Sequence, residues 1–273
     1  MPSPMRLSGR TAVVTGAASG IGRAIAVSLA RRGCHLALAD VNEAGLAETA
    51  AQVRGPGLRV STHRLDVSDR AAVAAFPDPV GREHPGVDLL FNNAGVALGG
   101  SFEQVSDEDV EWLFDINFWG VVRMTRAFLP LLRKSDDARL VNVSSVFGLI
   151  APPEQAAYAA SKFAVRGFTE ALRHELAGSS VGVSVVHPGG VATAIADSAR
   201  IPAGAPADEV ERRRAAFKKN LALPAAVAGE TIVCGVEQRQ PRILVGRDAK
   251  VLALLERLAP VSYWKVLGRM VPR

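Results

Sequence analysis

Three glycines within residues 15–22 (TGAASGIG) constrain the fold of this chain more than any other feature of its sequence. They follow an apolar run typical of a strand, 11–16, and open an amphipathic helix expected over 20–33. Glycine permits the tight turn and the close backbone approach that a pyrophosphate requires, while the first turn of a helix offers free N–H groups and the positive end of its dipole. The pattern predicts a strand–turn–helix unit that binds a phosphate-bearing ligand, with a tight turn that binds nothing as the alternative.

Short apolar runs alternate with longer amphipathic stretches along most of the chain. Strands are expected at 11–16, 35–40, the end of 59–67, 87–92, 139–145, 181–187 and 242–245. Helices are expected at 20–33, 42–54, 69–75 (interrupted by Pro77 and Pro79), from Ser106 to a bend or end near Pro130, at 156–177 and from about 224. These repeats predict an α/β fold, a Rossmann-like doubly wound parallel sheet of about seven strands with helices on both faces. No linker or internal repeat interrupts residues 1–273, so we expect a single domain.

The composition is that of an ordinary globular protein, with 48% hydrophobic and 22% charged residues. No apolar run approaches the roughly 20 residues that a membrane-spanning helix needs, and no signal-peptide pattern opens the sequence. Cys34 and Cys234 are lone thiols, which suits a reducing compartment, so a cytoplasmic location is expected. The five histidines are scattered without metal-ligand spacing, and no metal site is predicted.

Positive charge is concentrated in the last part of the sequence. Residues 239–273 carry eight basic and two acidic side chains, a net charge of +6, whereas the preceding 238 residues have a net charge of −1. A near-neutral body argues against nucleic-acid binding. Residues 248–273 are expected to form an amphipathic extension, with two apolar stripes separated at Pro260 and edged by bases. The stripes consist of Val251, Leu252, Leu254, Leu255 and Leu258, then Tyr263, Trp264, Val266, Leu267 and Met270. Two interpretations stay open: docking on the protein or a partner subunit, which we favour, or weak contact with an anionic membrane surface.

Asp40 ends the second expected strand, 18 residues after Gly22. A carboxylate at this place can accept hydrogen bonds from both hydroxyls of an adenosine ribose, and it would repel a 2′-phosphate. No base follows at position 41, and Arg23 lies beyond the last glycine. The position therefore favours NAD over NADP, with a helix cap or surface aspartate as the alternative.

Seven short motifs occur in order between about residues 10 and 195, and together they resemble the single-domain type of the short-chain dehydrogenase/reductase family. They are TGAASGIG at 15–22, Asp66-Val67, NNAG at 92–95, Asn117, Ser145, YAASK at 158–162 and PGGVAT at 188–193. The resemblance implies a nicotinamide cofactor bound by Gly16, Ser19, Gly20, Ile21, Gly22, Asp40, Asp66, Val67, Asn93, Ala94, Gly95, Tyr158, Lys162, Pro188, Gly189, Val191 and Thr193. In this set Asp66 and Val67 would flank the adenine, while Val191 and Thr193 would hold the nicotinamide carboxamide and a nearby phosphate.

Tyr158 and Lys162 are four residues apart on an expected helix, so they share a face. A neighbouring ammonium, together with the charge of an oxidised nicotinamide, would lower the pKa of the tyrosine from its usual value of about 10 and make it a general base. Ser145 ends a strand, and its hydroxyl can hold the substrate oxygen. By resemblance, Asn117 would anchor a water that relays protons from Lys162. Asn117, Ser145, Tyr158 and Lys162 are thus the expected catalytic residues.

The expected reaction is hydride transfer between NAD, with NADP less favoured, and a secondary alcohol or ketone. An NADPH-dependent carbonyl reductase is the alternative among enzymes. A catalytically silent dinucleotide-binding sensor or scaffold is the alternative of another class, and such a protein would be expected to lack Tyr158, Lys162 or Ser145.

Apolar residues around the expected site suggest a lipid-like or cyclic substrate if they line the pocket, and a loop core or interface if they do not. They are Val96, Leu98, Phe147, Leu149, Ile150, Pro152 and Pro153. Residues 196–220, which contain Pro202, Gly204 and Pro206, are expected to form a mobile lid over the substrate. Trp112 and Trp119, seven residues apart on the long helix, are expected to pack a helix–helix interface, and relatives imply a homodimer or homotetramer.

Overall fold

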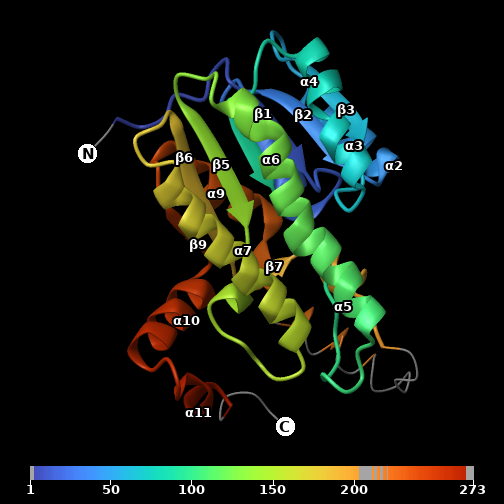
Figure 1. The fold of residues 1–273 in the computed structure, drawn as a ribbon, viewed down its shortest axis with the longest axis vertical. Coiled ribbons are helices and arrows are strands. Elements are labelled where there is room, and N and C mark those ends of the chain that lie inside the picture. The colour runs from blue at the N-terminus through green and yellow to red at the C-terminus, as the bar shows by residue number, and fades with distance from the viewer. Residues whose placement is uncertain (1–2, 203–210, 212–213, 216–217, 220, 269–273) are drawn as a thin grey trace.

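The computed structural model describes residues 3–202, 211, 214–215, 218–219 and 221–268. Its strands form one parallel seven-stranded sheet in the order β3-β2-β1-β4-β5-β6-β9, with helices on both faces (Figure 1). The strands are β1 Thr11–Thr15, β2 His35–Asp40, β3 Val60–Arg64, β4 Leu89–Asn92, β5 Ala138–Val143, β6 Val181–Pro188 and β9 Arg242–Val245. The predicted doubly wound α/β fold is confirmed.

The helices follow the predicted alternation closely. The described α-helices are α1 Gly20–Arg31, α2 Glu43–Val53, α3 Arg70–Ala75, α4 Pro77–Glu83, α5 Asp107–Phe114, α6 Gly120–Leu132, α7 Ala156–Glu175, α9 Ala225–Glu237, α10 Arg247–Leu258 and α11 Tyr263–Leu267. The shorter helical turns are η1 Asp115–Trp119, η2 Val146–Gly148 and η3 Ala194–Ala196. Within the described residues, no helix combines the length and apolarity that crossing a bilayer needs.

The core consists of two apolar layers, one on each face of the sheet. Because side chains alternate along a strand, Val14 packs with the layer under α1, α2 and α9, whereas Val13 packs with the layer under α3, α4, α6 and α7. Strands buried on both faces read as continuous apolar runs, which is why β1 and β4 are apolar throughout their interior positions.

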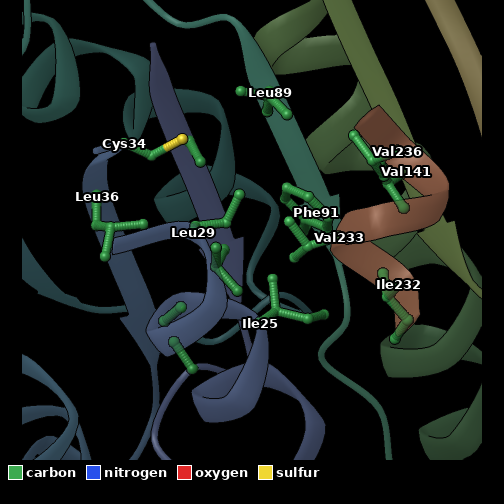
Figure 2. Packing of buried hydrophobic residues seen from close by; sticks show 14 of the residues in the cluster. Ile25, Leu29, Cys34, Leu36, Leu89, Phe91, Val141, Ile232, Val233 and Val236 are labelled. Carbon is green, nitrogen blue, oxygen red and sulfur yellow. The ribbon is translucent and has the colours of Figure 1, made fainter. Parts of the chain in front are cut away.

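Helices α1 and α9 approach each other closely over one face of the sheet. Figure 2 shows Ile25 and Leu29 of α1 directed toward Phe91 of β4, with Ile232 and Val233 of α9 beside them. All five side chains are fully buried. Burial of each such side chain stabilises the fold by about 1.5–3 kcal/mol, so this layer fixes the position of α1 and of the loop that precedes it.

Three local features differ from the predicted elements. The helix expected from Ser106 to Pro130 is divided into α5, the π-helical turn η1 and α6, and Pro130 lies inside α6, which ends two residues later at Leu132. Pro77 does interrupt the helix before it, but it also begins α4, since a proline has no N–H to leave unbonded in a first helical turn. A short parallel pair, β7 Val191–Ala192 with β8 Leu223–Pro224, was not predicted.

The order of the strands reverses beside β1, because β2 and β4 flank it and the chain leaves in opposite directions from there. In such sheets a crevice opens at the carboxyl ends of the strands at the reversal point. The predicted site motifs follow β1, β4, β5 and β6 at this edge.

Candidate active site

The glycine-rich loop between β1 and α1 is packed so tightly that its glycine positions leave little or no room for a side chain. A Cβ on Gly22 would lie 2.0 Å from the carbonyl oxygen of Gly16, and a Cβ on Gly16 would lie 2.9 Å from the Cα of Ala94. Gly16 and Gly20 also adopt φ angles of +65° and +52°, which disfavour other residues. Ser19 caps α1 without a side-chain hydrogen bond, so its hydroxyl and the first N–H groups of α1 are available to a ligand. The loop therefore has the backbone geometry and the donors that a pyrophosphate requires.

Thr15 and Asn93 hold this loop in place from beneath. The Asn93 amide donates to the carbonyl oxygens of Thr15 (3.0 Å) and Gly16 (3.2 Å). The buried Thr15 hydroxyl accepts from the N–H groups of Asn93 and Ala94 and donates to the carbonyl of Phe91. The side chain of Asn93 thus supports the loop, while its predicted place along the cofactor cleft stays a prediction. Thr15 was not singled out, although its place directly before Gly16 was visible in the motif.

Asp40 lies beside the same loop. Its carboxylate accepts hydrogen bonds from the N–H groups of Ala18 and Asn42, each at 3.0 Å, which leaves further lone pairs for ligand hydroxyls. Arg23, the nearest candidate for binding a 2′-phosphate, is engaged elsewhere: it donates to the carbonyl of Ala18 and forms an ion pair with Glu48 at 2.8 Å. A ligand at this loop would therefore meet the carboxylate of Asp40, while the guanidinium of Arg23 is already bound to protein groups.

Tyr158 and Lys162 occupy one face of α7 and are 9% and 5% exposed. The Lys162 Nζ lies 5.7 Å from the centroid of the Tyr158 ring and donates to the carbonyl of Val143 at 3.4 Å. Phe147 packs edge-on against the tyrosine, with 6.1 Å between ring centroids. The predicted pairing of these two side chains is therefore present in the structure.

Burial governs the protonation of both groups. It raises the pKa of Tyr158 to about 12, against the opposing effect of a hydrogen bond with Ser145. It lowers the pKa of Lys162 to about 8. The protein's own groups thus shift the pKa of Tyr158 in the direction opposite to the expected one. The pKa of Tyr158 can fall below its usual value only if a further positive charge lies near the ring. The sequence-based prediction assigned that charge to the oxidised nicotinamide.

Ser145 caps the start of η2, two residues after the end of β5, and its Oγ accepts a hydrogen bond from the N–H of Phe147 at 3.1 Å. His187 supports it from below: Nδ1 lies 2.8 Å from the carbonyl oxygen of Ser145, and because a carbonyl only accepts, this nitrogen carries the proton. The Nε2 of His187 is buried without a partner, and burial lowers the pKa of this side chain to about 4. The contact between His187 and Ser145 joins residues 42 positions apart, and the sequence alone did not indicate it.

Asn117 lies fully buried in η1. Its side chain bonds both backbone groups of Val96, at 2.8 and 3.0 Å, and the hydroxyl of Ser161 at 3.2 Å. A Cβ on Gly95 would lie 3.1 Å from Asn117 Oδ1 and 3.2 Å from Lys162 Nζ. The structure therefore brings Asn117, Gly95 and Lys162 together, while the water-anchoring role expected for Asn117 stays a prediction.

Other residues predicted to bind the cofactor lie around the same edge of the sheet, and they differ in their contacts and their burial. Thr193 packs against the glycine loop, since a Cβ on Gly20 would lie 3.0 Å from its methyl group. Val191 and Val67 are buried, at 3% and 7% exposure. The Asp66 carboxylate accepts hydrogen bonds from the N–H and the hydroxyl of Ser68 within its own loop, and its place beside the adenine stays a prediction.

The loop after β6, which contains Gly189 and Gly190, contacts a residue that the sequence analysis did not assign to the site. Asp248, in the first turn of α10, accepts a hydrogen bond from the N–H of Gly190 at 2.6 Å. A Cβ on Gly189 would lie 2.1 Å from the same carboxylate, so any other residue there would displace the Asp248 side chain. The proximity arises because β6 and β9 are parallel neighbours that both end at this edge.

The end of the chain also contacts the segment after Ser145. The Tyr263 hydroxyl accepts from the N–H of Ala151 at 2.9 Å, and Ala249 and Leu252 pack with Val146 and Ile150. The apolar residues predicted for the pocket are thereby divided between two environments. Leu98, Phe147 and Val96 form one cluster with Tyr158, whereas Ile150 is buried against α10 and α11.

The beginning of the predicted lid is tied to the site. Arg200 bonds Ala97 and Gly99 through its backbone, and its guanidinium lies 3.9 Å from the centroid of the Trp112 ring. Trp112 therefore contacts this segment, and it also belongs to the apolar cluster that includes Ala157 and Tyr158 of α7. Gly204, Pro206 and most of 203–220 lie outside the described residues, so the lid stays a prediction. Among the described residues, no group of three or more histidine, cysteine, aspartate or glutamate side chains is placed to hold a metal ion.

Comparison with known proteins identifies the family. A model of the short chain dehydrogenase family matches residues 10–203. This chain belongs to that family. It is 44% identical over 268 residues to the oxidoreductase SadH of Mycobacterium tuberculosis, which covers 97% of this chain and 96% of SadH.

Solved structures agree with this assignment. A short-chain dehydrogenase/reductase from Burkholderia phymatum in complex with NAD has a TM-score of 0.86 and 34% identity, covering 94% of this chain and 95% of that one. An alcohol dehydrogenase from Thermococcus sibiricus, complexed with 5-hydroxy-NADP, has a TM-score of 0.69 and 28% identity, covering 87% and 96%. The dehydrogenase described here is thus an oxidoreductase whose glycine loop fits a nicotinamide dinucleotide.

Proposed function

We propose that this dehydrogenase transfers a hydride between NAD and an apolar secondary alcohol or ketone. The observation that carries the proposal is the grouping of Ser145 with the buried Tyr158 and Lys162 at the carboxyl edge of the sheet, beside a loop in which Gly16 and Gly22 leave no room for a side chain. Such a group can exchange a proton with a hydroxyl or carbonyl oxygen in a site that water enters poorly.

The cofactor would be held by the residues around the glycine loop. The N–H groups at the start of α1 would bind the pyrophosphate, Asp40 the adenosine ribose, and the loop containing Gly189, Val191 and Thr193 the nicotinamide end. When bound, the nicotinamide accepts or supplies the hydride.

The side chains of the protein would then handle the proton. Ser145 orients the substrate oxygen, and Tyr158 removes the hydroxyl proton in oxidation or returns it in reduction. Lys162, buried beside the ring, stabilises the phenolate in its charged form. His187 holds the backbone of Ser145 and so fixes the position of its hydroxyl.

An apolar substrate is supported by the side chains next to Tyr158. Phe147 contacts its ring, and Val96 and Leu98 belong to the same cluster. Apolar walls with a few polar groups are typical of sites for lipid-like or cyclic molecules.

The preference for NAD is tested by titrating the protein with NADH and NADPH and measuring nicotinamide fluorescence. We expect NADH to bind more tightly, and Asp40→Asn to strengthen NADPH binding about tenfold, because the variant removes the negative charge and keeps an acceptor oxygen. Asp78→Ser, on the exposed start of α4, is the matched control and should leave both affinities unchanged. Tighter binding of NADPH than of NADH by the unaltered protein would contradict the preference.

A further inference from the structure

The outward face of α10 carries a row of exposed apolar side chains. Val251, Leu254, Leu258 and Val261 are 63%, 56%, 73% and 93% exposed. The first three are spaced three and four residues apart along one side of α10, and Val261 lies in the turn that follows the helix. The other side of α10 packs on the protein, as described above, so the apolar stripe predicted from the sequence is in fact divided between two faces.

Basic side chains border this row. Arg247, Lys250 and Arg257 are exposed at the same helical spacing, and among the described residues none of them forms an ion pair. The two acidic residues of α10 are engaged elsewhere. Asp248 binds the Gly190 N–H, and the half-buried Glu256 acts on Arg242, where its negative charge partly opposes the lowering of the Arg242 pKa by burial. The outward face is therefore apolar and positively charged, without an opposing carboxylate.

We propose that this face rests on the surface of a membrane that contains anionic lipid. A convex helix with apolar side chains between bases is suited to lying in the plane of a bilayer, because the apolar groups enter the acyl boundary while the bases meet the headgroup phosphates. Arg269 and Arg273 add two further positive charges to the sequence beyond α11. Since no described helix can span a bilayer, the contact is peripheral.

The charge pattern argues against a second copy of the chain as the partner of this face. A two-fold contact would bring Arg247, Lys250 and Arg257 of both copies together with no carboxylate on the face to offset them. An anionic surface instead pairs with every base of the row.

The position of α10 would bring the proposed membrane surface close to the active site. β9 runs parallel to β6, and α10 begins directly after Gly246, so the helix starts at the edge of the sheet that holds Ser145 and the glycine loop. A membrane under α10 would lie beside the mouth of the site. The binding itself does not depend on the proposed reaction.

Sedimentation with sucrose-loaded vesicles tests the proposal on the full chain. We expect binding to vesicles of equal parts phosphatidylglycerol and phosphatidylcholine, weak binding to phosphatidylcholine alone, and loss of binding at high salt. Leu254→Ser with Leu258→Ser should reduce the affinity at least tenfold, roughly in proportion to the apolar area lost. Lys250→Gln with Arg257→Gln should reduce it roughly 30-fold.

Control substitutions elsewhere on the surface distinguish binding through this face from non-specific binding to vesicles. Val227→Ser removes an apolar side chain that is 48% exposed on α9, and Lys134→Gln removes an exposed base after α6; both should bind as the unaltered protein does. The proposal would be overturned if the folded, unaltered protein did not bind anionic vesicles at low salt. It would also be overturned if the protein bound neutral vesicles as tightly as anionic ones. A Leu254→Ser, Leu258→Ser protein that keeps its vesicle binding, or one that instead separates from an oligomer into monomers, would overturn it as well.

Discussion

Lys162 is an amine enclosed by protein, and the energetic cost of that enclosure explains much of the site. Removing an ammonium from water disfavours its charged form, which is why the pKa of Lys162 is lowered to about 8. The same burial raises the pKa of Tyr158 to about 12. Burial thus favours the neutral form of both side chains and moves their pKa values apart, so the tyrosine gives up its proton readily only once a further positive charge joins the site.

His187 should make the stability of the protein sensitive to acid. Burial lowers its pKa from 6.5 to about 4, so above pH 6.5 both the folded and unfolded states are neutral. As the pH falls from 6.5 to 4, the unfolded chain binds a proton that the folded protein does not, and the free energy of unfolding decreases until the loss is complete below pH 4. His84, whose pKa burial also lowers to about 4, acts in the same direction.

Urea denaturation at several pH values measures this effect. His187→Asn keeps an N–H near the position of Nδ1 but cannot titrate, so it should lose less stability than the unaltered protein between pH 6.5 and 4. His174→Asn, at an exposed position, should follow the unaltered protein. A His187→Asn curve parallel to that of the unaltered protein would show that His187 does not titrate as described.

The sequence predicts contacts between side chains where the geometry of a single helix or strand determines them. Tyr158 and Lys162 share a face because four residues make about one helical turn. The partners of Asn117 and Asp248 could not be predicted, since they depend on contacts between segments 21 and 58 residues apart. His187 likewise meets Ser145 across two neighbouring strands.

At the level of the elements, the contact between α1 and α9 depends on one glycine. A Cβ on Gly229 would lie 2.5 Å from the carbonyl carbon of Ala24, a backbone atom that cannot move alone. Gly229→Ala should therefore lower the free energy of unfolding by about 1–3 kcal/mol, as overpacking does elsewhere.

Gly167 provides a control inside another helix. It lies in α7, and a Cβ at this position would have no neighbouring atom within 4 Å, so Gly167→Ala should be neutral or stabilise by about 0.4–1 kcal/mol. Thermal or urea unfolding of the two variants distinguishes them. Equal stability would mean that the α1–α9 contact is looser than the structure shows.

The hydrogen bond between Asp248 of α10 and the loop after β6 predicts that substitution of Asp248 changes the KM for the cofactor. Asp248→Ala removes the acceptor of the Gly190 N–H and the group that packs on Gly189, which frees the loop that we propose holds the nicotinamide end of the cofactor. We expect the KM for NAD to rise several-fold, with a smaller change in kcat. Asp248→Asn, which keeps an acceptor oxygen, should recover most of the affinity; an unaltered KM in Asp248→Ala would refute the positioning role.

Element types were predictable from periodicity, whereas their interruptions were not. The amphipathic pattern from Ser106 onward is continuous, and the π-helical turn within it adjusts the backbone around the buried Asn117 without leaving a sequence signal. The two-residue strands β7 and β8 are too short for any periodicity to register.

At the scale of the whole molecule, the parallel sheet collects residues that are far apart in the sequence at one edge. This outcome follows from repeated strand–helix units and was predictable, as were the motifs that end the strands. The oligomeric state stays a prediction. Trp119 and Phe163, at 47% and 38% exposure, offer apolar surface on η1 and α7 for a two-fold contact, and sedimentation equilibrium is the measurement that checks it.

The central claim is that Tyr158 exchanges the proton while NAD exchanges the hydride. The direct measurement is the rate of NAD reduction by the unaltered protein and by Tyr158→Phe, with cyclic and long-chain secondary alcohols as substrates. We predict that Tyr158→Phe binds NADH as the unaltered protein does and loses roughly 10²–10⁴-fold in kcat/KM, because only the proton-transferring group is removed. Undiminished turnover by Tyr158→Phe would contradict the account.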